Sequence, residues 1–192
     1  GLDILLDAAT HPQPSVRGAA ASALGDLGKV QGIPALERAL EDKIPAVKTS
    51  AAISLGELGV KDSIIPLRKA LADPNPVVKA AVVSALLRAG EPFGTVAPAL
   101  YELMQNHDPG TRSAAGKAVG RAHGTNTRAA IEFLAGMLKD PIPRPRIAAA
   151  RALGQIDDLD ALPILRAALH DEDDAVRATA GGAIARLINH SK

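Results

Sequence analysis

Apolar residues recur along the chain with helical spacing, in short segments that alternate with longer ones. In the longer segment that begins at Val16, apolar residues stand at positions 16, 20, 24 and 27, which is one stripe of an α-helix. In the shorter segment that follows, Ile33, Leu36 and Leu40 form a second such stripe. We find no run of alternating apolar and polar residues bounded by turn pairs, the pattern of a strand. The pattern therefore predicts an all-α chain.

The pair of segments, helix A and helix B, recurs six times. Each helix B begins with a basic residue that is 31 to 34 positions from the next one. No pair can bury its own apolar stripe, so neighbouring pairs must stack. We predict one domain, residues 1–192, folded as a right-handed α-solenoid with repeats near 1–30, 31–61, 62–92, 93–124, 125–157 and 158–192. The basic anchors are Arg17, Lys48, Lys79, Arg112, Arg146 and Arg177.

Proline and glycine mark where the predicted helices begin and end. Pro34 stands at the opening of its helix A, where no N–H is required. Gly28 and Gly59 follow a helix B, the usual place of a left-handed residue. The third and fourth repeats depart most, because Leu87 replaces a glycine within helix B and Thr111 replaces a valine. We expect the local curvature to differ around residues 88–130.

The recurring strings resemble a known repeat family. VRGAAASALGDLG from Val16 and IPALERAL from Ile33 are similar to HEAT repeats, and specifically to the short HEAT-like repeats of phycobilisome (PBS) lyases. The resemblance covers essentially the whole chain and implies a solenoid whose B helices line the concave side. Such repeats occur in lyases, scaffolds and regulators, so the fold does not fix an activity. In the lyase family, HEAT subunits act in pairs that hold a tetrapyrrole and a client protein, which implies an alternative role as a lyase-like chaperone subunit.

The residue inventory argues against an enzyme. The chain has no cysteine, and none of its five histidines is followed by glutamate, as in the di-iron hydroxylases of HEAT type. Aromatic residues are 2% of the chain, too few to stack on flipped bases, so nucleic acid is not a favoured partner. GTRSAAGKA from Gly110 departs from a phosphate loop, since Ala118 stands where Ser or Thr would bind magnesium. We predict no catalytic, cofactor-binding or metal-binding residue.

Targeting signals are equally sparse. We see no apolar run long enough to span a membrane and no signal peptide, so the default expectation is a cytoplasmic location without membrane contact. The first residue is Gly1, which leads us to expect a processed or excised part of a longer protein.

Two variable positions of helix B carry most of the differences between repeats. Both lie opposite the apolar stripe, and together they change from acidic in the first two repeats to basic from the third onward. Residues 109–156 hold eight Lys or Arg against two acidic residues, in a chain of net charge +1. The columns read Ser22, Ile53, Ser84, Lys117, Arg151, Gly182 and Asp26, Glu57, Arg88, Arg121, Gln155, Arg186.

This charge pattern has two interpretations. The first is an ordinary solvated surface. The second is a concave face that binds an acidic protein segment, because clustered like charge repels itself and steers acidic partners. On the second interpretation, the chain is a non-enzymatic scaffold or regulatory module. Its predicted partner-binding residues are Arg88, Lys117, Arg121, Arg151, Arg186, Asp26, Glu57 and Ile53.

Two further expectations concern packing. Asp42, Asp73, Asp140 and Asp171 each precede an anchor by six residues, which predicts a ladder of Asp–Arg/Lys contacts and helix-start caps with a structural role. In the first helix A, Ile4 and Leu6 make the helix apolar on more than one side, and Leu6 stands where other repeats are polar. A terminal repeat normally has a polar outer face, so we expect upstream residues or another chain to cover this one.

Overall fold

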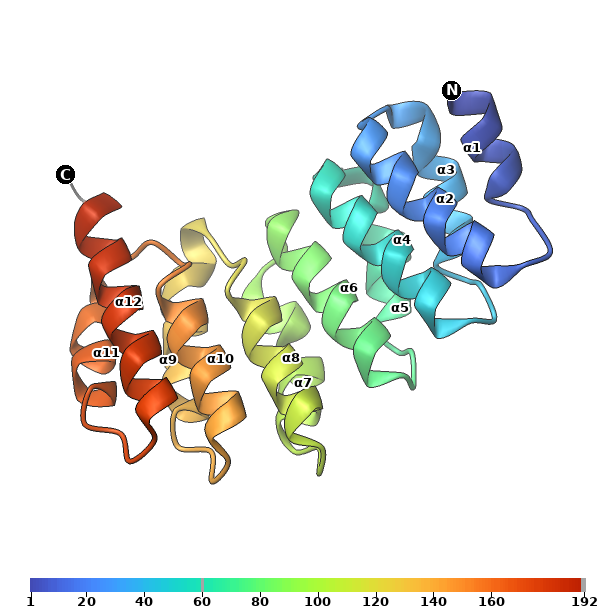
Figure 1. The fold of residues 1–192 in the computed structure, drawn as a ribbon. Helices are drawn as coiled ribbons and strands as arrows, with labels where there is room; N and C mark the ends of the chain where they lie inside the picture. The colour runs from blue at the N-terminus through green and yellow to red at the C-terminus, as the bar shows by residue number, and fades with distance from the viewer. Residues whose placement is uncertain (60, 191–192) are drawn as a thin grey trace. The chain divides into compact units, whose positions relative to one another are not determined.

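The computed structural model describes residues 1–59 and 61–190. Within these residues the chain forms twelve α-helices, four short 3-10 turns and no strand (Figure 1). The helices follow one another as six A/B pairs, so the predicted all-α architecture is confirmed. The 3-10 turns, which the sequence pattern did not indicate, precede four of the A helices: Val30–Gly32, Lys61–Ser63, Gly124–Asn126 and Leu159–Ala161. No described helix combines the length and the apolar character needed to cross a membrane.

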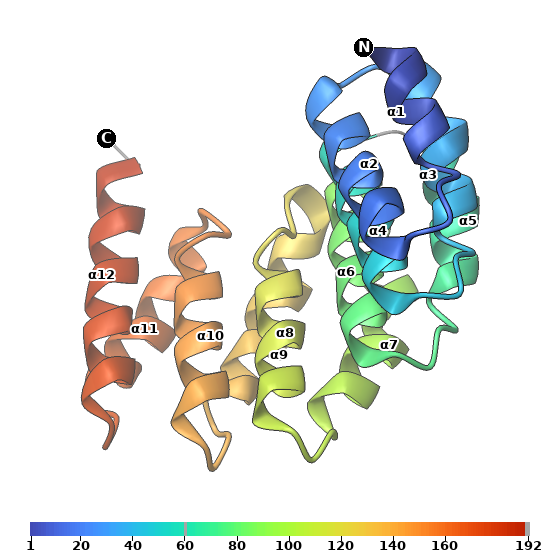
Figure 2. The same cartoon turned by 45° about the vertical axis from the view of Figure 1, so that its right-hand side comes forward.

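The chain divides into two compact units, Gly1–Glu91 and Pro92–Lys192. In each unit the three B helices pack side by side in one layer and the A helices form the other (Figures 1 and 2). The first unit contains α1 (Leu2–Ala8), α2 (Pro14–Leu27), α3 (Ile33–Ala39), α4 (Pro45–Leu58), α5 (Ile64–Ala70) and α6 (Pro76–Arg88). The second contains α7 (Phe93–Met104), α8 (Pro109–Val119), α9 (Thr127–Met137), α10 (Pro143–Leu153), α11 (Leu162–Ala168) and α12 (Asp174–His190).

Leucines from both layers form the core of each unit. Leu36 of α3 and Leu55 of α4 are buried in the first unit, and Leu134 of α9 and Leu153 of α10 are their counterparts in the second. Each buried leucine contributes about 1.5–3 kcal/mol relative to an exposed one. Packing between the A and B layers is therefore the main source of stability in each unit.

In four of the six repeats a glycine stands eight positions after the anchor and lets neighbouring B helices pack closely. A Cβ on Gly154 would lie 2.6 Å from Cβ of Ala183, and one on Gly56 would lie 2.8 Å from Cα of Ala85. These distances are too short for any side chain, so the glycines permit the observed approach of neighbouring helices. Gly25 and Gly120 occupy the same position and face Ser54 and Ala152.

The helix ends follow the predicted turn chemistry. Gly28 and Gly59 are left-handed, with φ of 68° and 62°, and Pro34 lies in the first turn of α3, as predicted. Asn75 caps α6, since its side chain accepts hydrogen bonds from the N–H groups of two residues in the first turn. Ile142 occupies the same position before α10 in an extended conformation and provides no acceptor.

Replacement of Ile142 by asparagine should raise the free energy of unfolding by about 1 kcal/mol, the usual contribution of an N-cap. Asn75 shows that the substitution fits, because the two turns have the same backbone contact. The N–H of Asn75 donates to Asp73, and the N–H of Ile142 donates to Asp140. Urea titration followed by circular dichroism measures the change, and Ile142→Val is the control without an acceptor. An unfolding midpoint equal to that of the control would show that α10 gains nothing from a cap.

The first A helix has no buried residue. Ile4 of α1 is 72% exposed, and Leu6 is only partly buried. The expectation that upstream residues or another chain cover this face stays a prediction.

Candidate partner-binding surface

A row of partly buried ion pairs joins neighbouring turns between the A and B helices. Nε and Nη2 of Arg112 donate to the two carboxylate oxygens of Asp140, at 2.6 and 2.9 Å. Its Nη1 donates to the carbonyl oxygens of Asn106 and His107 in its own turn, at 2.8 and 3.1 Å. One guanidinium therefore holds two turns together. We call this arrangement the clamp.

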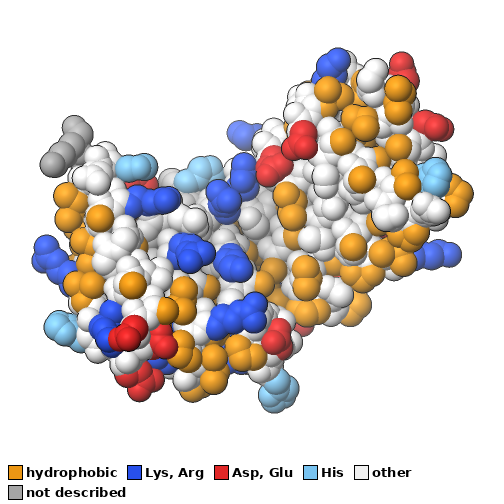
Figure 3. Space-filling model, viewed as in Figure 1, with side chains coloured by type: hydrophobic (Ala, Val, Ile, Leu, Met, Phe, Trp, Pro, Cys, Tyr) orange, Lys and Arg blue, Asp and Glu red, His pale blue; other side chains and the backbone are white. Residues whose placement is uncertain are grey.

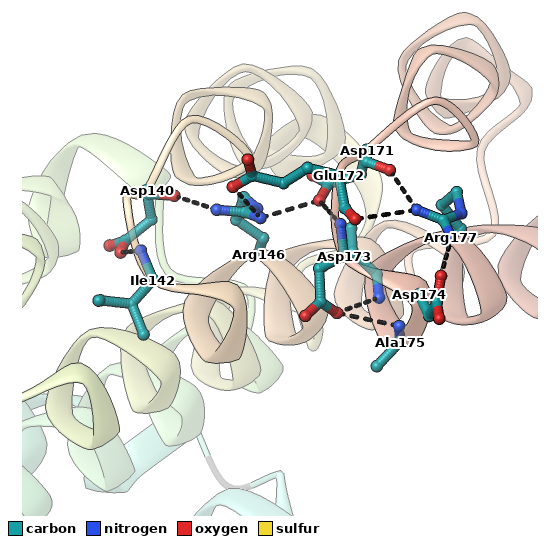
Figure 4. Close-up of polar contacts among 10 residues, drawn as sticks. Asp140, Ile142, Arg146, Asp171, Glu172, Asp173, Asp174, Ala175 and Arg177 are labelled. Carbon is teal, nitrogen blue, oxygen red and sulfur yellow. Dashed lines mark hydrogen bonds and ion pairs between the residues drawn. The ribbon is translucent and has the colours of Figure 1, made fainter.

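The clamp recurs in both units. Arg17 pairs with Asp42 and Lys48 with Asp73, each at 2.6 Å. Arg146 pairs through Nη2 with Asp171 at 2.8 Å and also contacts Glu172 (Figure 4).

The sequence prediction of a ladder was right about the residue types but assigned the wrong partners. Each Asp was expected to contact the anchor that follows it by six residues. Instead, Asp140 pairs with Arg112, which precedes it by 28 residues in the neighbouring helix pair. The reason is that Nη1 of Arg146, the following anchor, donates to the backbone carbonyl of Asp140, not to its carboxylate. The carboxylate remains directed at the preceding repeat.

The carboxylates of the clamp are held in their charged form. The hydrogen bond from Arg112 lowers the pKa of Asp140, and the hydrogen bond from Arg17 lowers that of Asp42. The N–H of Ile142 donates to Asp140 at 2.9 Å, so the aspartate also orders its own turn. The side chains of Arg112 and Asp140 are only 13% and 10% exposed. These residues are occupied by structural contacts and are not available to a partner.

Four of the predicted binding residues of the second unit are exposed on its B-helix layer. Lys117 lies on α8, Arg151 on α10 and Arg186 on α12, while Arg121 lies two positions after the end of α8. None of these four side chains forms an ion pair with a residue of the described part of the chain. Lys and Arg side chains gather over α8, α10 and α12 on this face (Figure 3). We call the four residues the cationic face.

The predicted residues of the first unit have a different character. Asp26 and Glu57 are exposed on α2 and α4, and Ile53 of α4 is 48% exposed. Arg88 is partly engaged, because its Nε donates to the carbonyl oxygen of Gly56 at 3.1 Å. It therefore helps to terminate α4, a role that was not visible as a sequence pattern.

Grooves between A helices were not predicted. In the second unit a groove of about 520 Å³ lies between α9 and α11, and its floor is mainly apolar. The corresponding groove of about 510 Å³ between α3 and α5 is charged, and Lys69 pairs across it with Glu41 at 2.6 Å. The sequence indicates these grooves only through side chains of the A helices that lie outside the apolar stripe. Residues of the apolar groove include Ala135, Leu138, Pro163, Ile164 and Ala167.

Clusters of three or more side chains suited to bind a metal ion do not occur among the residues that the structure describes. The candidate surface thus has two parts: the clamps in the turns, which are structural, and the exposed cationic face on the B-helix layer of the second unit.

Comparison with known proteins identifies the family to which this architecture belongs. A family model described as HEAT repeats matches residues 2–87, 66–143 and 96–185, together nearly the whole chain. The chain belongs to the HEAT-repeat family. No curated protein matches the sequence.

Solved structures agree with this assignment. The HEAT-repeat chain is similar to a structure of the complex of CpcE and CpcF of phycocyanin lyase from Nostoc sp. PCC7120, with a TM-score of 0.67 and 25% identity over 96% of this chain and 76% of that chain. An engineered protein is 18% identical, with a TM-score of 0.58 over 98% and 96% of the two chains. A designed armadillo repeat protein is 17% identical, with a TM-score of 0.52 over 97% and 100%. The last two matches concern the fold alone.

Proposed function

We propose that this HEAT-repeat chain is a non-enzymatic protein-interaction module that binds an acidic protein segment on the cationic face. The observation that carries the proposal is the contrast between two sets of basic residues in the second unit. Arg146 is buried and Arg112 partly buried, and both are paired, whereas Lys117, Arg121, Arg151 and Arg186 are exposed and have no ion partner among the described residues. Like charges that gather on one face repel one another, and an acidic ligand offsets that repulsion.

The placement of the aromatic side chains favours a polypeptide over a nucleic acid as the ligand. Single-stranded nucleic acids need aromatic side chains between the cations, on which bases stack. The aromatic residues of this chain, Phe93, Tyr101 and Phe133, lie on α7 and α9 in the A-helix layer, where their rings contact one another edge to face. The cationic face on the B helices therefore offers charge and hydrogen bonds but no stacking surface.

Replacement of Lys117, Arg121 and Arg151 by glutamine should weaken the binding of a fluorescent decaglutamate peptide by a factor of about 3 to 150. Three charges are lost from the contact surface, and exposed pairs contribute roughly 0.2–1 kcal/mol each. The dependence of affinity on salt should become flatter, because fewer charges are screened. Fluorescence anisotropy at several salt concentrations measures both effects.

The matched control removes three exposed basic residues from the A-helix layer: Arg128, Lys139 and Arg166. This variant has the same net charge as the first one. If both variants lose the same affinity, the peptide responds to overall charge and the cationic face is not a binding site. Unchanged affinity in the first variant would reject the proposal directly.

A second candidate function is a lyase-like subunit that holds a tetrapyrrole for a client protein. The similarity to the phycocyanin lyase complex favours it. Addition of a linear tetrapyrrole to the purified chain would then shift and intensify the visible absorbance, with saturation near one pigment per chain. An absorbance that rises only in proportion to added pigment would argue against this function.

A further inference from the structure

The groove between α9 and α11 lacks the ion pair that spans its counterpart in the first unit. Between α3 and α5, Nζ of Lys69 donates to Glu41 across the groove, at 2.6 Å. Counted back from the clamp aspartates, Ala167 stands in place of Lys69 and Lys139 in place of Glu41. An alanine and a lysine cannot form such a pair. The groove of the second unit is therefore open, with a volume of about 520 Å³.

The surface of this groove combines apolar side chains with basic ones that have no ion partner. Leu138, Pro163 and Ile164 provide apolar surface. Lys139 lines the groove and is exposed, and Arg166 is exposed on α11, three positions after Pro163. Neither basic residue forms an ion pair with another residue in the part of the chain that the structure describes. Apolar surface beside unpaired positive charge is complementary to a ligand that is both apolar and acidic.

The position of the groove excludes the helix pairs of the same row as its cover. The groove lies between two A helices, and each of them packs on the B helix of its own pair, α9 on α10 and α11 on α12. A further pair of a solenoid stacks on the end of the row and leaves this groove open. The backbone groups of both walls are bonded within their helices, so the groove offers no edge to an extended strand. An amphipathic helix has the shape that packs into such a groove.

We propose that this groove docks an amphipathic helix of a partner protein, with the apolar face of that helix in the groove and its carboxylates beside Lys139 and Arg166. The seven residues of α11 span about two helical turns. The docked helix therefore presents apolar anchors at positions i, i+3 or i+4, and i+7, with acidic residues beside them. Asp171 also lines the groove, but its charge is offset by Arg146, which pairs with it at 2.8 Å.

A synthetic helical peptide with leucine at the anchor positions and glutamate on its other face tests the proposal by fluorescence anisotropy. The double variant Lys139→Glu with Ala167→Lys restores the ion pair of the first unit and closes the groove. It should bind the peptide about tenfold or more weakly, because buried anchors carry most of the energy of such contacts. Both positions are exposed on the surface, and circular dichroism verifies that the variant is folded.

The matched control is Lys139→Gln, which lowers the net charge by one, as the double variant does, and leaves the groove open. It should lower the affinity by a factor of about 5 or less, the effect of losing one exposed ion pair. A lysine version of the peptide, with the same leucines, should bind more weakly than the glutamate peptide.

A second pair of variants locates the bound peptide. The chain has no cysteine, so Ala167→Cys places a single thiol in the groove, and Gln155→Cys places one beside the cationic face. A bromoacetyl group next to the leucines of the peptide should alkylate the first variant and leave the second unmodified. The Lys117, Arg121 and Arg151 triple variant should bind the peptide like the wild type. This proposal is therefore tested independently of the cationic face.

Four results would overturn the proposal. The peptide could fail to bind the wild type, bind the double variant as tightly as Lys139→Gln, or alkylate Gln155→Cys in preference to Ala167→Cys. The lysine peptide could also bind as tightly as the glutamate peptide. Sedimentation velocity adds a test of another occupant: a wild-type dimer that dissociates in the double variant would show that a second copy of this chain fills the groove, which contradicts the proposal.

Discussion

Replacement of Gly154 by alanine will lower the free energy of unfolding by about 2 kcal/mol, within the range typical of added atoms in a packed interior. The new methyl group would lie 2.6 Å from Cβ of Ala183 and 2.9 Å from its Cα. Because one of these atoms belongs to the backbone of α12, a rotamer change cannot relieve the overlap. The helices must separate, and the leucines beneath them lose contact. Urea unfolding followed by circular dichroism measures the loss.

Gly182 provides the matched control within the same pair of helices. It lies in the interior of α12, and no atom would come within 4 Å of an added Cβ. Alanine there should raise the free energy of unfolding by about 0.5–1 kcal/mol, because glycine is a poor helix former. The two substitutions thus have opposite predicted signs. If Gly154→Ala were neutral or stabilising, the close approach of α10 and α12 would not depend on the glycine.

Gly154 also shows which features of the helix packing could be predicted from the sequence alone. The recurring strings identified the glycine position of helix B, and the apolar stripes identified the helices, because both features are local and periodic. The packing partner of Gly154 was not predictable in this way, since Ala183 belongs to another repeat and its approach depends on how two helices cross. The departure at Leu87 was visible in the sequence, and the boundary between the two compact units follows at residue 91.

For the charged residues too, the sequence predicted local features but not contacts between distant residues. Exposure of Lys117, Arg121 and Arg151 could be predicted, because the sequence places them opposite the apolar stripe of a predicted helix B. The clamp partners could not, because the sequence places Asp140 six residues before Arg146 and 28 after Arg112, and proximity along the chain favours the wrong pair. The bond from Arg88 to the carbonyl of Gly56 was also hidden, since backbone acceptors leave no trace in the residue types.

Replacement of Arg112 by methionine will lower the free energy of unfolding by about 3 kcal/mol at neutral pH. Asp140 is 10% exposed, and after the substitution its carboxylate keeps only the hydrogen bond from the N–H of Ile142. Removing one member of a fully buried ion pair typically costs about 3–5 kcal/mol, because the other charge is left uncompensated. The Arg112–Asp140 pair is partly buried, so we place its loss at the lower end of this range. The carbonyl oxygens of Asn106 and His107 also lose their donor.

Arg128→Met is the control for a lost arginine. Arg128 pairs with Glu132 at 3.3 Å on the surface of α9, and both side chains are largely exposed, at 91% and 68%. Pairs of this kind contribute little to stability. This variant should therefore unfold like the wild type, and an equal loss in both variants would mean that the clamp has no special role.

The clamp also determines how stability depends on pH. The hydrogen bond from Arg112 lowers the pKa of Asp140 below that of the unfolded chain, so the folded state binds fewer protons in mild acid. Its contribution is complete above the carboxyl pKa of an unfolded chain, about 3.9, and is lost as the pH falls from there through the lower pKa of the folded state. Arg112→Met removes the cause of the shift. The difference in unfolding free energy between wild type and variant should therefore shrink as the pH falls from about 5 toward 3, as urea titrations at several pH values would show. A difference that stays constant over this range would mean that the charge of Asp140 does not stabilise the contact between α8 and α10.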